Sequence, residues 1–356
     1  MIVFGFEAVI NPKLASYTIP TGPALEFVSL GPEGRFWDHF STNKRLRTAI
    51  RKQSSKIDML LLRVPSHKAY FIWKYLGKPK KTLLLFVGNQ YYNNAYSNNG
   101  LWMHIFRTIR SNLHDHRMNK ISNHGSALIF ANSPALVTLW EGILNKQVRL
   151  IKTSSISETD IVSVIPEREE TQDSMRLLFV GRVCNDKGVR ELLDAMALLN
   201  QQKANGYFLD IVGPEGDLGG YTISELMEKK GVSSQCKHHG VVPFGDQLFE
   251  YYSRADVYIL PSYHEGMPHT IWEALAQGTP VISTPVGGVG DFFIDGFDIL
   301  LIPVRDHKSI AEVVISLESN KLLRGSLIRN GLKKVRTVTR EGQAKALTST
   351  ISRVWK

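Results

Sequence analysis

Short apolar runs that alternate with helical patterns are the feature that most constrains the fold of this chain. In the second half, runs of β-branched and other apolar residues bounded by turn residues predict strands at 176–181, 207–212, 257–260, 280–283 and 299–302. Helical periodicity fills the segments between them. Continuous apolar strands that alternate with helices indicate a parallel sheet covered on both faces, as in a doubly wound Rossmann-like domain.

The first half repeats this style less clearly, with apolar runs at 24–30, 57–64, 82–87, 126–130 and 161–165. A chain of 356 residues is long enough for two α/β domains with separate cores. We therefore predict an α/β protein of two Rossmann-like domains facing across a cleft. The predicted parts are an N-terminal domain over 1–165, a polar linker over 166–175, a second domain over 176–335 and a helix over 336–356 that crosses back to the first domain.

The excess of positive over negative charge lies entirely in the first half. Residues 1–170 hold 22 Lys and Arg against 12 Asp and Glu, so the remainder holds 43 − 22 = 21 basic and 33 − 12 = 21 acidic residues. The first half is therefore expected to meet any anionic surface. No apolar run approaches the length of a membrane span, and Glu7 interrupts any secretory apolar region, so we expect a cytoplasmic protein. Cys184 and Cys236 are too few for a disulfide framework and fit a reducing compartment.

Residues 176–188 (RLLFVGRVCNDKG) combine an expected strand, a turn at Gly181 and a helix that opens at Gly188. Ligands of doubly wound sheets bind at the carboxyl ends of strands, where helix N-termini present free N–H groups. Arg182 would offer bidentate donors and Lys187 a mobile point charge, which suits a departing diphosphate. Two solvated charges in an ordinary loop explain this segment alone equally well.

Residues 261–293 contain two glutamates eight positions apart, Glu265 in a loop and Glu273 in the helix that follows. Eight positions of helix span at most roughly 12 Å, on the order of the distance from sugar to ribose in a nucleotide sugar. The loop would bring the N–H groups of Gly266 and Met267 close to the donor. A capping box formed by Thr270 and Glu273, with Gly278 as the helix stop, is the alternative. That alternative leaves the Glu-Gly-x-Pro turn and the Gly287-Gly288 loop unexplained.

The segments GRVCNDKG, EGMPHTIWEALAQGTPVIST and PVGGVGDFFIDG resemble the retaining glycosyltransferases of group 1, family 4, which have the GT-B fold. The resemblance covers about residues 176–306. It implies that Arg182 and Lys187 bind the donor diphosphate, that Glu273 binds the ribose, and that Glu265 with Gly266 and Met267 contacts the transferred sugar. It also places Gly213, Pro214, Gly216 and residues 242–244 near the nucleotide, although these loops equally suit simple chain turns.

The predicted site is therefore a set of twelve residues. Glu265, Arg182 and Lys187 are expected to be catalytic, and the substrate-binding residues are expected to be Glu273, Gly266, Met267, Pro268, Gly181, Gly213, Val242, Phe244 and Thr270. In this family cations stabilise the leaving diphosphate in place of a metal, and the chain has no Asp-x-Asp pair. We expect no cofactor and no metal requirement.

The first half departs from the family pattern. Relatives usually have a Gly-rich loop after the first strand, whereas this chain offers only the turn at 21–23. Family members often use an N-terminal-domain histidine, and the chain offers His67, His104, His114, His116 and His124, among which the sequence does not decide.

The first half also carries a basic amphipathic pattern. Arg107, Arg110, His114 and Arg117 recur at helical spacing opposite Trp102, Ile105, Ile109 and Leu113, and Lys44, Arg45, Arg47, Arg51 and Lys52 form a second basic run. A solvated helix face is the ordinary reading of such a pattern. With the charge excess, contact with anionic lipid or a pyrophosphate-linked acceptor is the better hypothesis. Nucleic acid is disfavoured because the chain lacks a recognition motif.

The sequence therefore predicts a retaining glycosyltransferase that moves a hexose or N-acetylhexosamine from a UDP- or GDP-sugar to a lipid-linked glycan acceptor in surface polysaccharide biosynthesis. The expected location is cytoplasmic, peripheral on the inner face of the cell membrane. Two alternatives stay open. One is a non-catalytic nucleotide-sugar-binding protein with a regulatory or assembly role, and the other is a nucleotide-sugar epimerase on the same fold.

Overall fold

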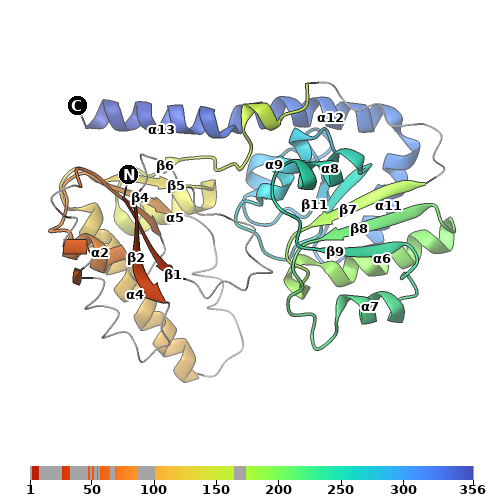
Figure 1. Ribbon diagram of the computed structural model, residues 1–356, viewed down its shortest axis with the longest axis horizontal. Helices are drawn as coiled ribbons and strands as arrows, with labels where there is room; N and C mark the ends of the chain where they lie inside the picture. Colours follow the sequence, from red (N-terminus) through yellow and green to blue (C-terminus); the bar gives the residue numbers. More distant parts are fainter. Residues whose placement is uncertain are drawn as a thin grey trace. The chain divides into compact units, whose positions relative to one another are not determined.

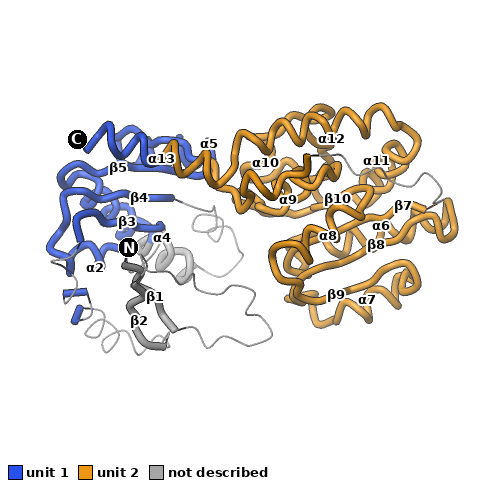
Figure 2. Tube along the Cα trace, turned by 45° about the horizontal axis from the view of Figure 1, so that its top comes forward, with its two compact units in different colours: residues 1–151, 348–356 blue, residues 152–347 orange. Residues whose placement is uncertain are grey.

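The computed structural model of the chain describes residues 2–7, 26–32, 47–48, 50–51, 54, 57–64, 69–86, 101–163 and 174–355. For residues 2–7, 26–32 and 101–110 it describes the backbone. The chain divides into two compact units, residues 1–151 with 348–356 and residues 152–347 (Figure 2). Each unit is built on its own parallel sheet (Figure 1).

Unit 2 contains a six-stranded sheet whose strands all run parallel, in the order β12-β11-β10-β7-β8-β9. The strands are β7 (Met175–Val180), β8 (Tyr207–Val212), β9 (Cys236–Gly240), β10 (Val257–Leu260), β11 (Val281–Ser283) and β12 (Leu300–Leu301). The two central strands β7 and β10 are buried along almost their whole length, which explains their continuous apolar sequence.

Helices alternate with the strands of unit 2, as the sequence predicts. The alternating helices are α6 (Val189–Gln202), α7 (Ile223–Lys229), α8 (Asp246–Arg254), α9 (His269–Ala276) and α10 (Val289–Phe292). After β12 come α11 (His307–Ser319), α12 (Lys321–Val335) and α13 (Arg340–Val354), and α13 runs into the residues 348–356 that group with unit 1. One continuous apolar cluster links the inner faces of α6, α8, α9 and α11 with the strands. The doubly wound architecture predicted for the second half is confirmed.

Unit 1 contains a four-stranded parallel sheet in the order β3-β4-β5-β6, and a separate parallel pair of β1 and β2. The strands are β1 (Ile2–Glu7), β2 (Glu26–Pro32), β3 (Leu60–Val64), β4 (Thr82–Phe86), β5 (Leu128–Ala131) and β6 (Arg149–Leu150), and the helices are α2 (Ala69–Tyr75), α4 (Leu101–Ser122) and α5 (Pro134–Leu144). Phe86 stacks on Trp140 at 3.9 Å between ring centroids in the core of this unit.

One predicted strand needs correction, and three strands were not predicted. Residues 161–163 form no strand, whereas β1, β6 and β9 were not predicted. Of the predicted linker, residues 166–173 lie outside the described residues. The last nine residues group with unit 1, and the indole Nε1 of Trp355 donates a hydrogen bond to the carbonyl of Ser126 at 2.7 Å.

The predicted faces of α4 are wrong where its side chains are described. His114 is 4% exposed and lies edge-on to Trp140, and Arg117 packs over the rings of Tyr70 and Phe71. Leu113, expected on the buried face, is 46% exposed. The helix therefore does not present His114 and Arg117 as a solvated basic stripe. The other residues of the pattern, at 102, 105, 107, 109 and 110, have side chains outside the described residues, as do Lys44, Arg45 and Lys52.

The candidate histidines of unit 1 occupy different surroundings. His124 contacts the carbonyl of Lys78 through Nε2 at 3.0 Å and packs edge-on against Trp73, whereas His116 is exposed. His67 and the side chain of His104 lie outside the described residues, as does the turn at 21–23. None of the described helices is long and apolar enough to cross a membrane.

Candidate functional site

The centre of the unit 2 sheet is the place where the strand order reverses. Chain order runs outward from β7 through β8 to β9 on one side, and from β10 through β11 to β12 on the other. The connections that follow β7 and β10 therefore depart in opposite directions from the carboxyl ends of these strands, which is where doubly wound sheets bind ligands. These connections lie within the two predicted motifs, 176–188 and 261–293: residues 181–188 follow β7 and residues 261–268 follow β10.

Glycines allow the loop after β7 to approach both neighbouring loops. Gly188 has φ +69°, and a Cβ there would lie 2.1 Å from the carbonyl oxygen of Pro261. Gly213 has φ +136°, and a Cβ there would lie 1.9 Å from the carbonyl oxygen of Gly181. A larger residue at either position would meet backbone atoms that cannot move independently. The predicted glycines Gly181 and Gly213 thus form a backbone contact that packs the strand ends together.

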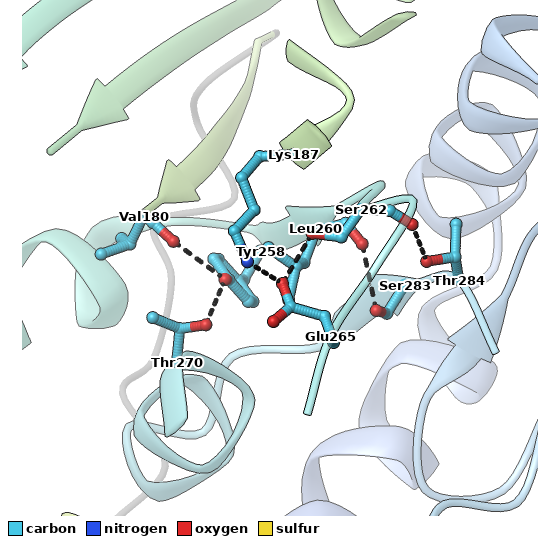
Figure 3. A network of polar contacts seen from close by, with 9 residues as sticks. All are labelled: Val180, Lys187, Tyr258, Leu260, Ser262, Glu265, Thr270, Ser283 and Thr284. Carbon is cyan, nitrogen blue, oxygen red and sulfur yellow. Dashed lines mark hydrogen bonds and ion pairs between the residues drawn. The ribbon is translucent and has the colours of Figure 1, made fainter. Parts of the chain in front are cut away.

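Lys187 and Glu265, one from each connection, form an ion pair (Figure 3). The ammonium of Lys187 forms an ion pair with Oε1 of Glu265, and the hydroxyl of Ser262 donates to the same oxygen at 2.7 Å. Their side chains are only 18% and 10% exposed. Water screens such a pair less than a surface pair, so an arriving anion would compete with Glu265 for Lys187.

Hydrogen bonds from the end of β11 fix the loop that carries Glu265. The hydroxyl of Thr284 donates to the carbonyl of Ser262 at 2.6 Å, and the hydroxyl of Ser283 donates to the carbonyl of Leu260 at 3.0 Å (Figure 3). On its other side, the N–H of Gly288 donates to the carbonyl of Gly266 at 2.6 Å. The Gly287-Gly288 loop therefore supports the Glu265 loop. This contact explains the pair of glycines, which the capping-box alternative left unexplained.

Tyr258 lies in β10 and is fully buried. Its hydroxyl is 2.7 Å from the hydroxyl oxygen of Thr270 and 3.2 Å from the carbonyl oxygen of Val180 (Figure 3). Burial raises the pKa of this phenol well above its usual value, so it stays a donor. Thr270 is therefore inside α9 and is engaged with the sheet. The capping-box alternative is wrong, because Pro268 occupies the N-cap and no side chain caps the helix.

Glu273 is 5% exposed and accepts two hydroxyl hydrogen bonds. Ser155 donates to Oε1 at 3.0 Å, and Tyr252 of α8 donates to Oε2 at 2.9 Å. Burial raises the pKa of the carboxyl above its ordinary value, while the hydrogen bonds from Tyr252 and Ser155 oppose this rise. Each carboxylate oxygen of Glu273 therefore accepts a hydroxyl hydrogen bond from the protein itself.

The remaining predicted residues lie around this centre in different settings. Arg182 is exposed and its stem lies against Gly216, where a Cβ would be 3.3 Å from the arginine Cγ. Met267 and Pro268 are buried at the start of α9. Val242 and Phe244 follow β9 and are half-buried, with Phe244 edge-on to Phe249 at 5.4 Å.

Sequence reasoning missed several residues that hold this site. Ser155 and Tyr252 are 118 and 21 positions from Glu273, and no local pattern connects them. Tyr258 was hidden in an apolar run that predicts only a buried strand. Ser262 stands three positions before Glu265, so a search for hydroxyls near that glutamate had the means to find it.

The second half of the chain is similar in sequence to a known protein family. Residues 164–334 match the family described as glycosyl transferases group 1. The D-inositol 3-phosphate glycosyltransferase of Arthrobacter sp. (strain FB24) is 31% identical over 154 residues, which cover 43% of this chain and 36% of that protein. The putative teichuronic acid biosynthesis glycosyltransferase TuaC of Bacillus subtilis is 34% identical over 151 residues, which cover 42% of this chain and 34% of TuaC. The chain thus matches about a third of the length of these relatives.

Solved structures extend the likeness in fold to most of the chain. Sucrose-phosphate synthase of Thermosynechococcus elongatus matches with a TM-score of 0.71 at 20% identity, over 95% of this chain and 85% of that one. Anabaena HepE, solved in complex with UDP-glucose, matches with a TM-score of 0.65 at 15% identity, over 91% of this chain and 86% of that one. Two parallel α/β sheets of the GT-B type are therefore the fold of this protein, as predicted. The family match itself is confined to residues 164–334, which resemble the group 1 glycosyltransferases.

Proposed function

We propose that this protein is a retaining glycosyltransferase that moves a hexose or N-acetylhexosamine from a UDP- or GDP-sugar to a lipid-linked glycan acceptor in surface polysaccharide biosynthesis. The observation that carries the proposal is the Lys187–Glu265 pair at the strand-order reversal of unit 2. The family match covers both residues. The other predicted site residues supply the proposed contacts around this pair.

The proposed reaction uses the cations to stabilise the leaving group. The bond between the anomeric carbon and the donor phosphate oxygen breaks while the acceptor hydroxyl oxygen bonds to the same face of that carbon. The departing phosphate takes the acceptor proton. Lys187 would leave Glu265 for the diphosphate, joined by the exposed Arg182, and Glu265 would then be free to accept hydrogen bonds from the sugar. Because negative charge grows on the phosphate in the transition state, these cations act on the rate more than on ground-state binding.

Glu273 is the proposed ribose ligand. Its carboxylate already accepts hydrogen bonds from two hydroxyls, those of Ser155 and Tyr252, and the residue is only 5% exposed. A ribose diol would replace or share one of these donors. The bidentate acceptor geometry of a carboxylate suits a vicinal diol.

The polysaccharide role rests on the relatives. TuaC carries a name that assigns it to teichuronic acid biosynthesis. A capsular polysaccharide biosynthesis glycosyltransferase of Staphylococcus aureus is 27% identical over 164 residues. HepE was solved with UDP-glucose, which supports a UDP-sugar as the first donor to test.

An anionic membrane surface is the proposed partner of unit 1, and a lysine loop supports it. Lys78, Lys80 and Lys81 lie in the turn between α2 and β4, and all three side chains are exposed. The backbone of the loop is fixed from inside. The carbonyl of Lys78 contacts His124 Nε2 at 3.0 Å, and the carbonyl of Lys80 accepts the N–H of Ser126 at 3.0 Å. The three ammonium groups therefore project from a fixed loop.

The indole of Trp355 borders this loop through its hydrogen bond to Ser126. Lysines with a neighbouring indole are typical of protein surfaces that meet anionic headgroups, where each cation near the surface contributes about 1 kcal/mol. The lysine loop replaces α4 as the support for membrane contact. Lysines in such a loop can also serve only to complement the dipole at the C-terminus of the preceding helix, here α2. Vesicle binding distinguishes this structural role from membrane contact.

Two measurements test the proposed function. Thermal-shift screening with UDP, GDP and ADP tests donor binding, and release of free nucleotide from UDP-glucose, UDP-N-acetylglucosamine and GDP-mannose tests turnover. We expect stabilisation by at least one nucleotide and nucleotide release that membrane extract accelerates. Binding without release in the presence of extract would favour the non-catalytic alternative. A sugar of changed identity that stays attached to its nucleotide would favour the epimerase.

A further inference from the structure

Tyr263 connects the two loops of the donor site. Its backbone N–H donates to the carbonyl of Asp186 at 2.8 Å, and its phenol donates to Oε1 of Glu191. Asp186 directly precedes Lys187, and Glu191 lies in the first turn of α6. Tyr263 therefore holds the segment that carries Lys187 on both sides, while Glu265 stands only two positions further along its own loop.

A third loop covers the ring of Tyr263. The guanidinium of Arg305, which lies between β12 and α11, is 4.8 Å from the ring centroid, a cation–π distance. Arg305 has φ +63°, a left-handed conformation that costs a residue with a side chain on the order of 1 kcal/mol. The fold keeps this arginine over the ring despite that cost. Tyr263 is thus held by the side chains of Arg305 in a loop and of Glu191 in α6.

Glu191 is bound to Tyr263 through only half of its carboxylate. Its Oε2 is buried and has no hydrogen-bond partner in the described part of the chain. A glutamate in the first turn of α6 complements the helix dipole, but this explains neither the burial of the carboxylate nor its bond to Tyr263. An unpartnered buried oxygen lowers stability, so stability alone does not account for a glutamate in this position.

We propose that Tyr263 and Glu191 form a positioning clamp that keeps the loops of Lys187 and Glu265 in register, so that the donor diphosphate and the transferred sugar are held at the same time. The inference rests on the proposed donor roles of Lys187 and Glu265. When the donor separates Lys187 from Glu265, the clamp keeps the relative position of the two loops unchanged. Neither clamp residue contacts the donor in this account.

A double-mutant cycle tests the clamp. Tyr263→Phe keeps the ring and the contact with Arg305 but removes the phenol, and Glu191→Ala removes its acceptor. We expect each variant to lower kcat/KM for UDP release from UDP-glucose about tenfold, mainly through kcat, since misplacement of a reacting group lowers the rate more than the affinity. The double variant should be no slower than the slower single variant, because both changes break one interaction. Losses that multiply in the double variant would overturn the clamp.

A conservative replacement separates positioning from simple stability. Glu191→Gln retains a carbonyl oxygen that accepts from the Tyr263 phenol, so we expect a rate close to wild type, whereas Glu191→Ala stays slow even at temperatures well below its Tm. Tyr221→Phe is the matched control, because this partly exposed tyrosine hydroxyl lies 3.5 Å from Lys229 outside the two donor loops. Equal damage by Glu191→Gln and Glu191→Ala would contradict the clamp.

The same assay distinguishes failure of the clamp from failure of the proposed function. If Lys187→Ala loses nucleotide release and Tyr263→Phe keeps it, the clamp is wrong and the donor site stands. If wild-type protein neither binds UDP nor releases it from UDP-glucose, and GDP- and ADP-sugars give the same result, the proposed donor site fails and the clamp with it.

Discussion

The two units of this molecule share an α/β plan but differ in charge. Unit 1, residues 1–151 with 348–356, holds 22 Lys and Arg against 7 Asp and Glu, and 22 − 7 gives +15. Unit 2, residues 152–347, holds 21 against 26, and 21 − 26 gives −5, so the two units together account for the net +10. The proposed site for an anionic donor nevertheless lies in the acidic unit.

This contrast between a basic unit 1 and an acidic unit 2 shows that the net charge of a domain does not predict where a proposed anion site lies. In unit 2 the strand order reverses between β7 and β10, and this reversal places one lysine at the carboxyl end of a strand beside a carboxylate that an arriving anion would displace. In unit 1 the described lysines at 78, 80 and 81 project from a loop that precedes a strand, at the opposite edge of a sheet. Such a surface suits a diffuse anionic partner. The four predictions below separate these two kinds of positive charge.

The largest expected effect is that of Lys187→Ala. Loss of a group that stabilises charge in the transition state typically lowers kcat by about 10²–10³-fold, so nucleotide release should fall by this amount while binding of the protein to vesicles stays unchanged. Lys237→Ala, which removes an exposed lysine of β9, is the matched control. A wild-type rate for Lys187→Ala would remove the lysine from the site.

The reciprocal change is Lys80→Gln with Lys81→Gln in the lysine loop. Each lysine near an anionic surface contributes about 1 kcal/mol, so binding to vesicles of phosphatidylglycerol and phosphatidylcholine should weaken about 30-fold. Sedimentation with vesicles at low and high salt measures this, and salt should weaken wild-type binding. The UDP-induced thermal shift should stay at its wild-type value. If wild-type protein does not bind these vesicles, the membrane proposal is wrong.

Glu273→Gln tests the proposed ribose contact within unit 2. The amide keeps the shape of the carboxylate but accepts through only one oxygen, so calorimetric titration should show UDP affinity reduced about tenfold, as for loss of a charged hydrogen-bond acceptor. Glu312→Gln on the exposed side of α11 serves as the control. Unchanged affinity of Glu273→Gln would assign Ser155 and Tyr252 as the only partners of this carboxylate.

The smallest effect concerns stability and pH. Burial raises the pKa of Glu273 above its ordinary value of 4.5, so the folded protein binds this proton more tightly than the unfolded chain does. Stability contributed by this group is therefore present at pH below 4.5 and falls as pH rises through the raised pKa. Glu273→Gln has no proton to lose, so its Tm should fall less than that of wild type over this range. Parallel curves of Tm against pH would contradict the burial effect.

The sequence predicted the parts of the fold that apolar patterns encode. β7, β8 and β10 were found because buried parallel strands read as continuous apolar runs. β9 was missed because its sequence CKHHG has no such run. The histidines of this edge strand instead hold it against β8 and the residue that follows β8. His238 Nε2 contacts the carbonyl of Gly213 at 2.9 Å, and His239 Nε2 contacts Asp210 at 2.6 Å.

Local sequence also predicted the loops of the site but not their partners. The motif spacing located Lys187 and Glu265, which the structure joins across 78 positions. It gave no signal for Ser155, Glu191 or Tyr263, since contacts between distant loops depend on the sheet topology. Helical periodicity assigned the faces of α4 wrongly, because the buried His114 packs against Trp140, a contact that hydrophobicity alone does not predict.

Hydrogen–deuterium exchange with and without UDP tests most directly that unit 2 binds the donor at the carboxyl ends of β7 and β10. The account predicts slower exchange in peptides that cover 181–188 and 261–273 when UDP is bound, and unchanged exchange in peptides that cover 77–86 of unit 1. Protection confined to unit 1, or UDP binding with no protection in either loop, would contradict the account.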